Sequence, residues 1–460
     1  MSQLPKGWVE TSFKEVSDYI QRGKGPKYAE FSEYPVVNQK AVRWFGLQEE
    51  HLKYVHPEQW DKWDELRYIR EGDILWNSTG TGTIGRACHI DQTQLSKAKV
   101  VDSHVTIVRT NKLVESKFAF YWVMHPEIQG NINGLYNGST NQVELSKKIV
   151  ESTRFPLAPL AEQTRIVEKL DEVLAQVDTI KARLDGIPAI LKRFRQSVLA
   201  AAVSGKLTEE WRGDSEYDSE RFPSSWSRKG LDDLGALARG KSKHRPRNDP
   251  RLFGNEYPFI QTGEVAQSNG VIECCTKWYS EFGLEQSRLF PKGTLCITIA
   301  ANIADTAILA IDACFPDSVV GFIPNPEVTS ALFVKYLIDV NKNRLEQFAP
   351  ATAQKNINLK VLKSLSLPYP TIDEQNEIVN QVERYFAFAD TIEAQVKKAQ
   401  ARVDKLTQSI LAKAFRGELV PQDPNDEPAD KLLERIAAAR AEADALAKAA
   451  KKAGRKTAKA

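Results

Sequence analysis

The feature that most constrains this chain is that its sequence is written twice. The segment LAEQTRIVEKLDEVL, which begins at Leu160, is matched by IDEQNEIVNQVERYF from Ile372, so an offset of 212 residues separates Glu162 from Glu374. The offset holds without a gap from about residue 139 to residue 208, and roughly a third of the positions from Pro156 onward are identical. A register kept over that length indicates duplication, so we expect two similar halves.

The segments that precede these stretches repeat more faintly. LPKGW, ending at Trp8, matches FPSSW, ending at Trp226, and QRGK (residues 21–24) matches ARGK (residues 238–241). YPVVNQKAV from Tyr34 matches YPFIQTGEV from Tyr257. The order that follows is a variable globule, a helix, a second variable globule and a second helix.

Each well-matched segment carries the pattern of a coiled-coil seam. Apolar side chains recur in alternating steps of four and three residues, which is a 3.5-residue period. We expect the two helices to pack antiparallel on each other as a spacer; the alternative is that each packs only on its own globule. Gly205 and Gly417 are predicted to end the helices, and Pro188 is predicted to kink the first. The seam residues are Ile166, Leu170, Val173, Val177, Ile180 and Leu184 in the first helix, and Ile378, Val382, Tyr385, Ile392, Val396 and Leu406 in the second.

The two variable segments are predicted to be small α+β domains. Both contain short β-like runs separated by turn signals, such as DILWN and HVTIVRT in the first and TLCITIA and VVGFIP in the second. Short helical stretches follow from Lys117 and Ala331. The fold class is therefore α+β: two globular domains joined by two long antiparallel helices, with a pseudo-two-fold internal repeat. The predicted divisions are residues 1–150, 151–213 (helical), 214–366, 367–420 (helical) and an alanine- and lysine-rich helical tail over 421–460.

Composition narrows the classes of function. The net charge is only +3, so an argument for nucleic-acid binding must depend on local clusters of charge. The five cysteines show no C-x-x-C spacing and the six histidines show no ligand spacing, so neither a disulfide framework nor a metal site is expected. No apolar run is long enough for a membrane span, and the start MSQLPKGWVE does not resemble a secretion signal, so a cytoplasmic protein is expected.

The strongest basic cluster spans residues 239–251, with six lysines and arginines against one aspartate. A thinner cluster in the first half occupies the matching place. Such clusters neutralise DNA phosphates, although a solvated loop is the alternative. The polar loops NGSTNQ (residues 137–142) and ATAQKN (residues 351–356) are a second candidate, because Asn and Gln read adenine edges; the alternative is a turn. The candidate DNA contacts are Arg22, Lys24, Lys27, Arg43, Asn77, Thr79, Asn141, Gln142, Arg239, Lys241, Lys243, Arg245, Arg247, Gln354, Lys355 and Asn356.

Two nucleotide-binding strings occur in an unsuitable context. Gly80–Gly85 fits G-x-G-x-x-G, but a strand rather than a helix is expected next, so a glycine-rich hairpin is favoured. Gly235–Ser242 fits the P-loop string, but LDDLGALA before it looks helical and the proline-bearing segment after it cannot open a helix. No catalytic motif is convincing elsewhere, so no catalytic residue is assigned.

At this point the chain resembles the specificity subunits of type I restriction-modification enzymes, in the branch of the classical enteric systems. The strings that carry the resemblance are PLAEQTRIVEKLDEVLAQVD, ILKRFRQSVLAAAVSGKLTEEWR, DEQNEIV, FAFADTIEAQV and LTQSILAKAFRGEL. The resemblance extends over residues 1 to about 420, and the globules match only in outline.

The resemblance implies that each globule reads one half of a bipartite site on double-stranded DNA and that the helices dock two modification subunits. It implies no cofactor in this chain; S-adenosylmethionine, ATP and Mg²⁺ are expected in the modification subunits and in the restriction subunits, which translocate and cut DNA. The alternatives are a self-contained DNA methyltransferase or ATPase, and a coiled-coil scaffold that does not read DNA.

Overall fold

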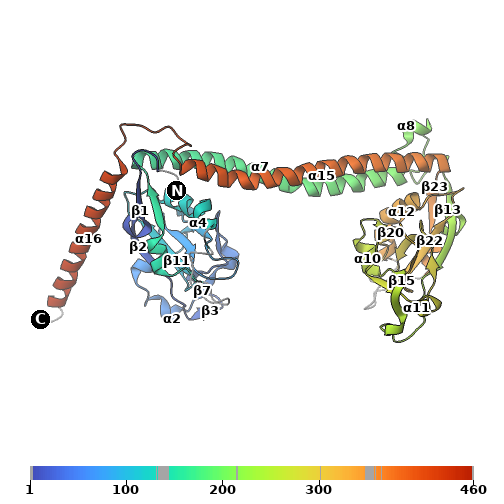
Figure 1. Cartoon of the computed structure of the whole chain (residues 1–460), viewed down its shortest axis with the longest axis horizontal. Coiled ribbons are helices and arrows are strands. Elements are labelled where there is room, and N and C mark those ends of the chain that lie inside the picture. The colour runs from blue at the N-terminus through green and yellow to red at the C-terminus, as the bar shows by residue number, and fades with distance from the viewer. Residues whose placement is uncertain are drawn as a thin grey trace. The chain divides into compact units, whose positions relative to one another are not determined.

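The computed structural model describes residues 4–130, 132, 144–213, 216–300, 302–347, 357, 359–363 and 365–457. The chain divides into two compact units: unit 1 comprises Met1–Leu184 and Ala399–Ala460, and unit 2 comprises Asp185–Lys398. Two long helices, α7 (Leu160–Val203) and α15 (Ile372–Ala414), run through both units (Figure 1). Each unit therefore holds one globule and a segment of each long helix.

The first globule, from β1 to β12, is built on an antiparallel sheet of order β2-β11-β8-β9, with a smaller sheet β10-β4-β7-β3 and a β5–β6 hairpin. Its first and last strands in sequence, β1 and β12, pair with each other. The strands are β1 (Val9–Ser12), β2 (Ser17–Arg22), β3 (Tyr28–Ala29), β4 (Pro35–Val37), β5 (Val42–Arg43), β6 (Gly46–Leu47), β7 (Lys53–Val55), β8 (Ile74–Asn77), β9 (Ala87–His89), β10 (Val100–Val101), β11 (Val105–Thr110) and β12 (Arg154–Leu157). The helices are α1 (Phe13–Val16), α2 (Pro57–Trp60), α3 (Ser116–Met124), α4 (Pro126–Gly130) and α6 (Lys147–Ser152).

The second globule, from β13 to β23, repeats this plan. Its main sheet has the order β14-β22-β19-β20-β16, its smaller sheet β17-β15-β21-β18, and β13 pairs with β23. The strands are β13 (Ser227–Gly230), β14 (Gly235–Arg239), β15 (Phe253–Phe259), β16 (Val271–Ile272), β17 (Lys277–Tyr279), β18 (Leu289–Phe290), β19 (Leu295–Thr298), β20 (Thr306–Leu309), β21 (Ala313–Cys314), β22 (Val319–Pro324) and β23 (Ser366–Tyr369). The helices are α8 (Glu209–Arg212), α9 (Leu231–Leu234), α10 (Thr262–Gln267), α11 (Glu281–Glu285), α12 (Ala331–Val340), α13 (Lys342–Gln347) and α14 (Leu359–Lys363). The predicted α+β class is confirmed.

Each globule is fastened to the start of the helix that follows it by the same pair of side chains. Trp8 Nε1 donates to Glu162 Oε2 at 3.0 Å, and Trp226 Nε1 donates to Glu374 Oε2 at 2.9 Å. Both carboxylates are almost completely buried. Glu374 also accepts from Arg212 Nη1 at 2.7 Å, so only the second copy forms a close ion pair. The sequence repeat is therefore matched in the structure by the same tryptophan–glutamate hydrogen bond in both copies.

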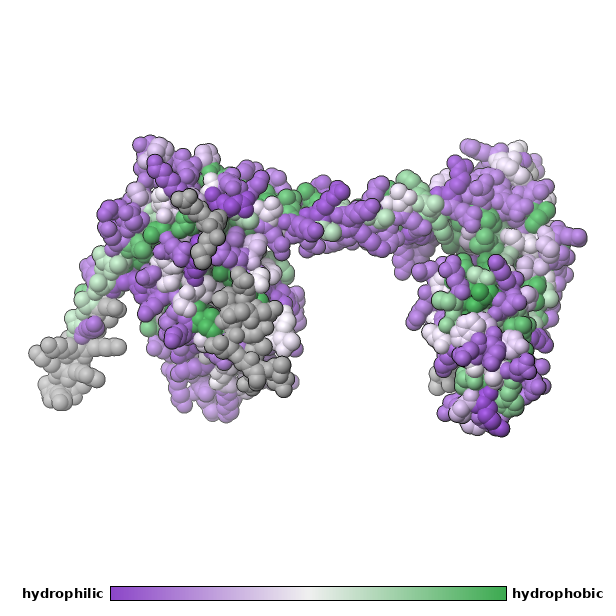
Figure 2. Space-filling model, in the orientation of Figure 1, coloured by the Kyte–Doolittle hydropathy of each residue, from purple (hydrophilic) through white to green (hydrophobic). Residues whose placement is uncertain are grey.

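The long helices pack against each other antiparallel inside each unit. Ion pairs join Lys181 to Asp404 in unit 1 and Arg195 to Asp390 in unit 2, so the numbering falls along one helix as it rises along the other. Pro188 lies inside α7 and does not interrupt it. Both helices are followed by a glycine with positive φ, Gly205 or Gly417, as predicted. Their visible surface is mainly hydrophilic, with scattered apolar patches (Figure 2).

The seam residues divide into two groups. Those near the globules are buried in the globules' own cores, so the helix ends pack on the domains as well as on each other. Others are only half covered: Tyr385 and Leu406 are each 43% exposed and Ile180 is 45% exposed. The buried seam residues are Ile166, Leu170, Val177, Ile378, Val382 and Val396, and the partly buried ones are Val173, Leu184 and Ile392.

The tail folds back onto the first globule. Helix α16 (Ala429–Thr457) buries Ala429, Leu432 and Ile436 in the core of that globule. Arg440 Nη1 donates to the carbonyl oxygen of Lys14 at 2.6 Å. The beginning of this helix is therefore a structural part of unit 1, an outcome that the tail's composition did not predict.

Candidate nucleic-acid interface

The tripeptide Arg-Gly-Lys ends the first strand of the main sheet in both globules. The amide of Gly23 donates to Val105 O at 3.0 Å, and that of Gly240 donates to Val319 O at 2.9 Å. At either glycine an added Cβ would overlap carbonyl oxygens of the neighbouring β10–β11 or β21–β22 loop. Glycine is therefore required by close approach of two backbones, and the predicted match of QRGK with ARGK is a structural equivalence.

The two arginines of these tripeptides are used mainly by the protein itself. Arg22 Nε donates to the carbonyl oxygen of Ser103, and Arg239 Nε donates to that of Asp317. Arg22 also forms an ion pair with Glu144. These guanidinium groups therefore hold loops in place, and their contact with DNA phosphates stays a prediction.

The other predicted cations differ in whether a carboxylate of the protein already pairs with them. Arg247 Nη2 lies 3.0 Å from Asp317 Oδ1, and Lys27 Nζ lies 3.8 Å from Glu58 Oε2. Within the described ranges, no carboxylate pairs with three exposed cations or with the half-buried Lys241. Unpaired cations are the ones that can meet phosphates without first breaking an ion pair. The three exposed ones are Lys24, Lys243 and Arg245.

The glycine-rich string lies in a turn between β8 and β9, which pair antiparallel, so the hairpin prediction is confirmed. Asn77 at the end of β8 is fully buried, and its Nδ2 donates to the carbonyl oxygens of Gln39 at 3.0 Å and Thr83 at 3.2 Å. The Asn77 amide therefore shapes the turn, and the predicted contact of Asn77 with DNA stays a prediction. Thr79 is half-buried, and its Oγ1 lies 2.6 Å from His104 Nδ1.

Three segments far apart in sequence meet at this end of the sheet. Ser78 N donates to His104 O at 2.9 Å, and Leu145 N donates to Ser78 O at 2.8 Å. The corresponding bonds of the second globule join Ile299 to Ser318 and Ile357 to Ile299, each at 2.9 Å. The β8–β9 turn, the β10–β11 loop and Leu145 therefore form one surface, the duplicated loop surface, and Ile299, Ser318 and Ile357 repeat the arrangement in the second globule. Five predicted contacts lie outside the described residues: Asn141, Gln142, Gln354, Lys355 and Asn356.

The P-loop string does not form a phosphate cradle. The expectation that LDDLGALA is helical is only half correct, because α9 ends at Leu234 and β14 begins at Gly235. After Lys241 the chain continues as a loop to a short 3₁₀ turn at Pro250–Leu252. A P-loop needs a helix whose N-terminus faces the phosphates, and none follows here. Among the described residues no group of His, Cys, Asp and Glu could hold a metal ion.

One basic cleft was largely missed in the sequence. It has a volume of about 460 Å³ and lies between the β5–β6 hairpin and the β8–β9 turn. Arg43 was a predicted contact, but Phe45 and Arg86 were not. The alternation of basic and aromatic residues in KAVRWF is a signal that could have pointed to it. The lining residues are Lys40, Arg43, Trp44, Phe45, Thr83 and Arg86.

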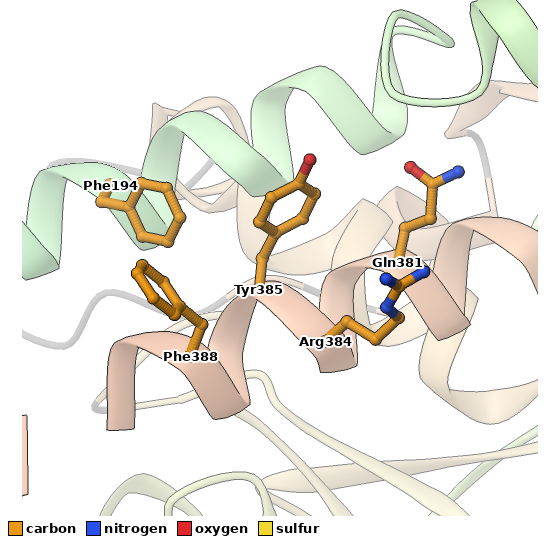
Figure 3. A pocket seen from close by; sticks show the side chains of 5 residues that line it. All are labelled: Phe194, Gln381, Arg384, Tyr385 and Phe388. Carbon is orange, nitrogen blue, oxygen red and sulfur yellow. The ribbon is translucent and has the colours of Figure 1, made fainter. Parts of the chain in front are cut away.

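A second cavity, of about 440 Å³, lies on the paired helices within unit 2. Figure 3 shows Phe194 of α7 facing Phe388 of α15, with Tyr385 beside them and Arg384 farther along α15. The rings of Phe194 and Tyr385 have centroids 6.1 Å apart, and Phe388 is 60% exposed. Aromatic rings left this open on a helix pair are typical of a surface that binds another protein.

No helix among the described residues combines the length and apolarity of a membrane span. Comparison with known proteins then gives the family. The family described as type I restriction modification DNA specificity domain matches residues 5–189 and 223–400.

Two relatives and one solved structure agree with this match. The chain is 37% identical over 338 residues to the type I restriction enzyme EcoBI specificity subunit of Escherichia coli, covering 66% of this chain and 69% of that protein. It is 30% identical over 472 residues to the EcoKI specificity subunit of Escherichia coli strain K12, covering 95% and 96%. A chain from a structural study of assembly and conformational transition in the type I R-M system has the same fold, with 18% identity, a TM-score of 0.70 and coverage of 91% and 100%. The protein therefore belongs to the family of type I restriction-modification specificity subunits, which are DNA-recognition subunits.

Proposed function

We propose that this chain directs a type I restriction-modification complex to a bipartite DNA site, with each globule reading one half. The observation that carries the proposal is the duplicated loop surface: each globule brings together an Arg-Gly-Lys tripeptide, the turn that follows β8 or β19, and the loop that precedes β11 or β22. A single site would need one such surface. Two copies on one chain suit two half-sites at a fixed separation.

The helices are proposed to set that separation and to dock two modification subunits. The support is their antiparallel packing in each unit and the exposed aromatic cavity of Phe194, Tyr385 and Phe388. At the matching positions of unit 1, Leu406 corresponds to Phe194 and is 43% exposed. The two docking surfaces are therefore similar in place and different in side chains.

The chemistry is proposed to lie in the partner subunits. In this proposal S-adenosylmethionine binds the modification subunits, which methylate adenine, and ATP and Mg²⁺ serve the restriction subunits, which translocate and cleave DNA. The specificity subunit selects the DNA sequence on which the partner subunits act. The complex is proposed to act in the cytoplasm.

The test is to co-express the chain with its modification subunits and to map methylated adenines across a bacterial genome. The expected result is methylation at one bipartite motif with a constant gap. In a second preparation Lys243→Gln and Arg245→Gln are combined, and occupancy is expected to fall at sites that depend on the second half of the motif. Lys292→Gln, at an exposed cation of the second globule between β18 and β19, is the control and should leave the map unchanged. Methylation at a continuous site, or without this chain, would overturn the proposal.

A further inference from the structure

The first globule carries the β5–β6 hairpin, which has no counterpart among the described strands of the second globule. Strands β5 and β6 form a two-residue connection whose tip is Trp44-Phe45, and the Phe45 side chain is 78% exposed. The segment YPFIQTGEV, which aligns with YPVVNQKAV, leads in the second globule to helix α10 instead. Because burying an exposed phenylalanine ring is favourable in free energy, this side chain is suited to contact an apolar surface of another molecule.

Three cations line the same cleft as this ring. Lys40 is exposed, Arg43 Nε donates to the neutral amide oxygen Gln48 Oε1 at 2.6 Å, and Arg86 Nη2 donates to Gly82 O at 3.3 Å. Across the described parts of the chain, none of the three is paired with a carboxylate. Burial and the nearby Arg43 guanidinium lower the pKa of Arg86, which stays charged because arginine titrates far above neutral pH. The cleft therefore concentrates positive charge that the protein does not neutralise.

The cleft is continuous with the duplicated loop surface. Thr83, which lines the cleft, belongs to the β8–β9 turn, and its Oγ1 donates to Gln39 Oε1 at 3.2 Å. Asn77 Nδ2 ties the same turn to the Gln39 carbonyl at 3.0 Å. A DNA backbone that meets the turn would also meet the cleft, since both belong to one edge of the first globule.

We propose that this cleft is a DNA subsite of the first globule, in which Lys40, Arg43 and Arg86 hold a phosphate and Phe45 contacts a base edge of the first half-site. The inference rests on the proposed function and adds residues and roles to it. Arginine and lysine around a phosphate give affinity without sequence preference, whereas an apolar ring against a thymine methyl gives preference. Because the described part of the second globule has no such hairpin, this subsite would contact only the first half of the bipartite DNA site.

The experiment uses the complex with its modification subunits and DNA that contains the motif found by methylation mapping. Lys40→Gln is expected to weaken binding of cognate DNA and of DNA altered in the first half by a similar factor, and to reduce the slope of log affinity against log salt by about one. Phe45→Ala is expected to reduce discrimination against the altered first half by about tenfold and to leave discrimination in the second half unchanged. Both side chains are exposed, so neither change threatens folding.

Matched controls lie on the same globule outside the cleft. Lys62→Gln and Leu66→Ala alter an exposed cation and an exposed apolar side chain, and both should bind like the unaltered complex. If the unaltered complex is specific but Phe45→Ala and Lys40→Gln behave like these controls, the subsite is refuted and the proposed function stands. If the unaltered complex has no sequence preference, the proposed function fails and the subsite fails with it.

Discussion

Replacing Glu374 with glutamine is expected to destabilise unit 2 by about 3 kcal/mol, the lower end for breaking a buried ion pair. The carboxylate accepts from three donors: Thr208 Oγ1 at 2.8 Å, Arg212 Nη1 at 2.7 Å and Trp226 Nε1 at 2.9 Å. A glutamine keeps one acceptor oxygen and presents an NH₂ group to the remaining donors. Arg212, whose side chain is 7% exposed, would lose its ion pair with the Glu374 carboxylate at 2.7 Å.

The repeat provides a matched control at Glu162. This carboxylate accepts from Trp8 Nε1 at 3.0 Å and from Gln422 Nε2 at 3.5 Å, and it has no close ion pair of the kind that Arg212 provides. Burial raises the pKa of Glu162, and the Trp8 and Gln422 hydrogen bonds and the Arg165 charge only partly offset this. Glu162→Gln keeps an acceptor for Trp8 and removes a buried charge, so we expect a change within about 1 kcal/mol.

The effect of Glu162→Gln on stability should also depend on pH. Because the pKa of Glu162 is raised in the folded state, the folded chain holds that proton more tightly than the unfolded chain. This contribution to stability is fully present below the unfolded pKa and is lost as pH rises through the folded one. Glu162→Gln has no such loss, so its stability relative to the unaltered chain should improve as pH rises from about 4 toward neutrality.

The assay is hydrogen exchange of the full chain read by peptide mass spectrometry, together with denaturant unfolding. Exchange locates the change, which matters because two units need not unfold in one step. Glu374→Gln should raise exchange around residues 204–212 and leave the start of α7 protected. Equal destabilisation by the two substitutions, or a larger loss from Glu162→Gln, would refute the assignment of the Arg212 ion pair as the source of the difference.

Three further outcomes are expected. Gly240→Ala should abolish methylation that depends on one half of the motif, because its Cβ overlaps backbone carbonyls, whereas Gly263→Ala, with open space around it, should be silent in the same map. Leu432→Ala should lower the stability of unit 1 by about 3 kcal/mol in thermal unfolding, because it opens a cavity under α16, while Leu446→Ala, at a 66% exposed position, should change it by less than about 0.5 kcal/mol. Lys181→Ala removes an exposed ion pair with Asp404 of α15 and should lower the free energy of unfolding by less than about 1 kcal/mol in denaturant. A larger loss would mean that solvent screens this ion pair less than its exposure indicates.

The duplicated parts of the fold were predictable because duplication preserves contacts as well as residues. The offset that joins Glu162 to Glu374 also aligns the two helix starts, and the faint match of LPKGW with FPSSW places Trp8 and Trp226 on those glutamates. Helix ends at glycine and the hairpin at the glycine-rich string follow from local backbone rules. Such features depend on neighbours in sequence, so a single sequence contains them.

The surroundings of the predicted contact residues could not be read from the sequence, because distant partners determine them. Arg22 finds its carboxylate at Glu144, and Arg239 finds its carbonyl at Asp317. The burial of Asn77 depends on packing that no local pattern reports. Charge counted along the chain therefore overestimated the number of free cations in the tripeptides, and it missed Arg86, which lies far in sequence from the hairpin it joins.

The tail was unpredictable for a related reason. An alanine-rich helix is equally compatible with solvent, a partner and the chain's own domain, and only the apolar face formed by Leu432 and Ile436 against the first core decides. The repeat offers a partial explanation. Val9, which packs against that core, is replaced at the matching position of the second globule by Ser227, which is polar.

The pairing of β1 with β12, and of β13 with β23, has a consequence for how such a chain can change over time. In each globule the chain arrives and departs on neighbouring strands, Val9 opposite Leu157 and Ser227 opposite Tyr369. The chain between these two strands leaves and returns to the same place. Its loops can therefore lengthen, shorten or be exchanged by recombination without changing where α7 or α15 begins. The part of each globule between its paired strands can therefore be replaced as one cassette, while the sequence and packing of both long helices are inherited unchanged.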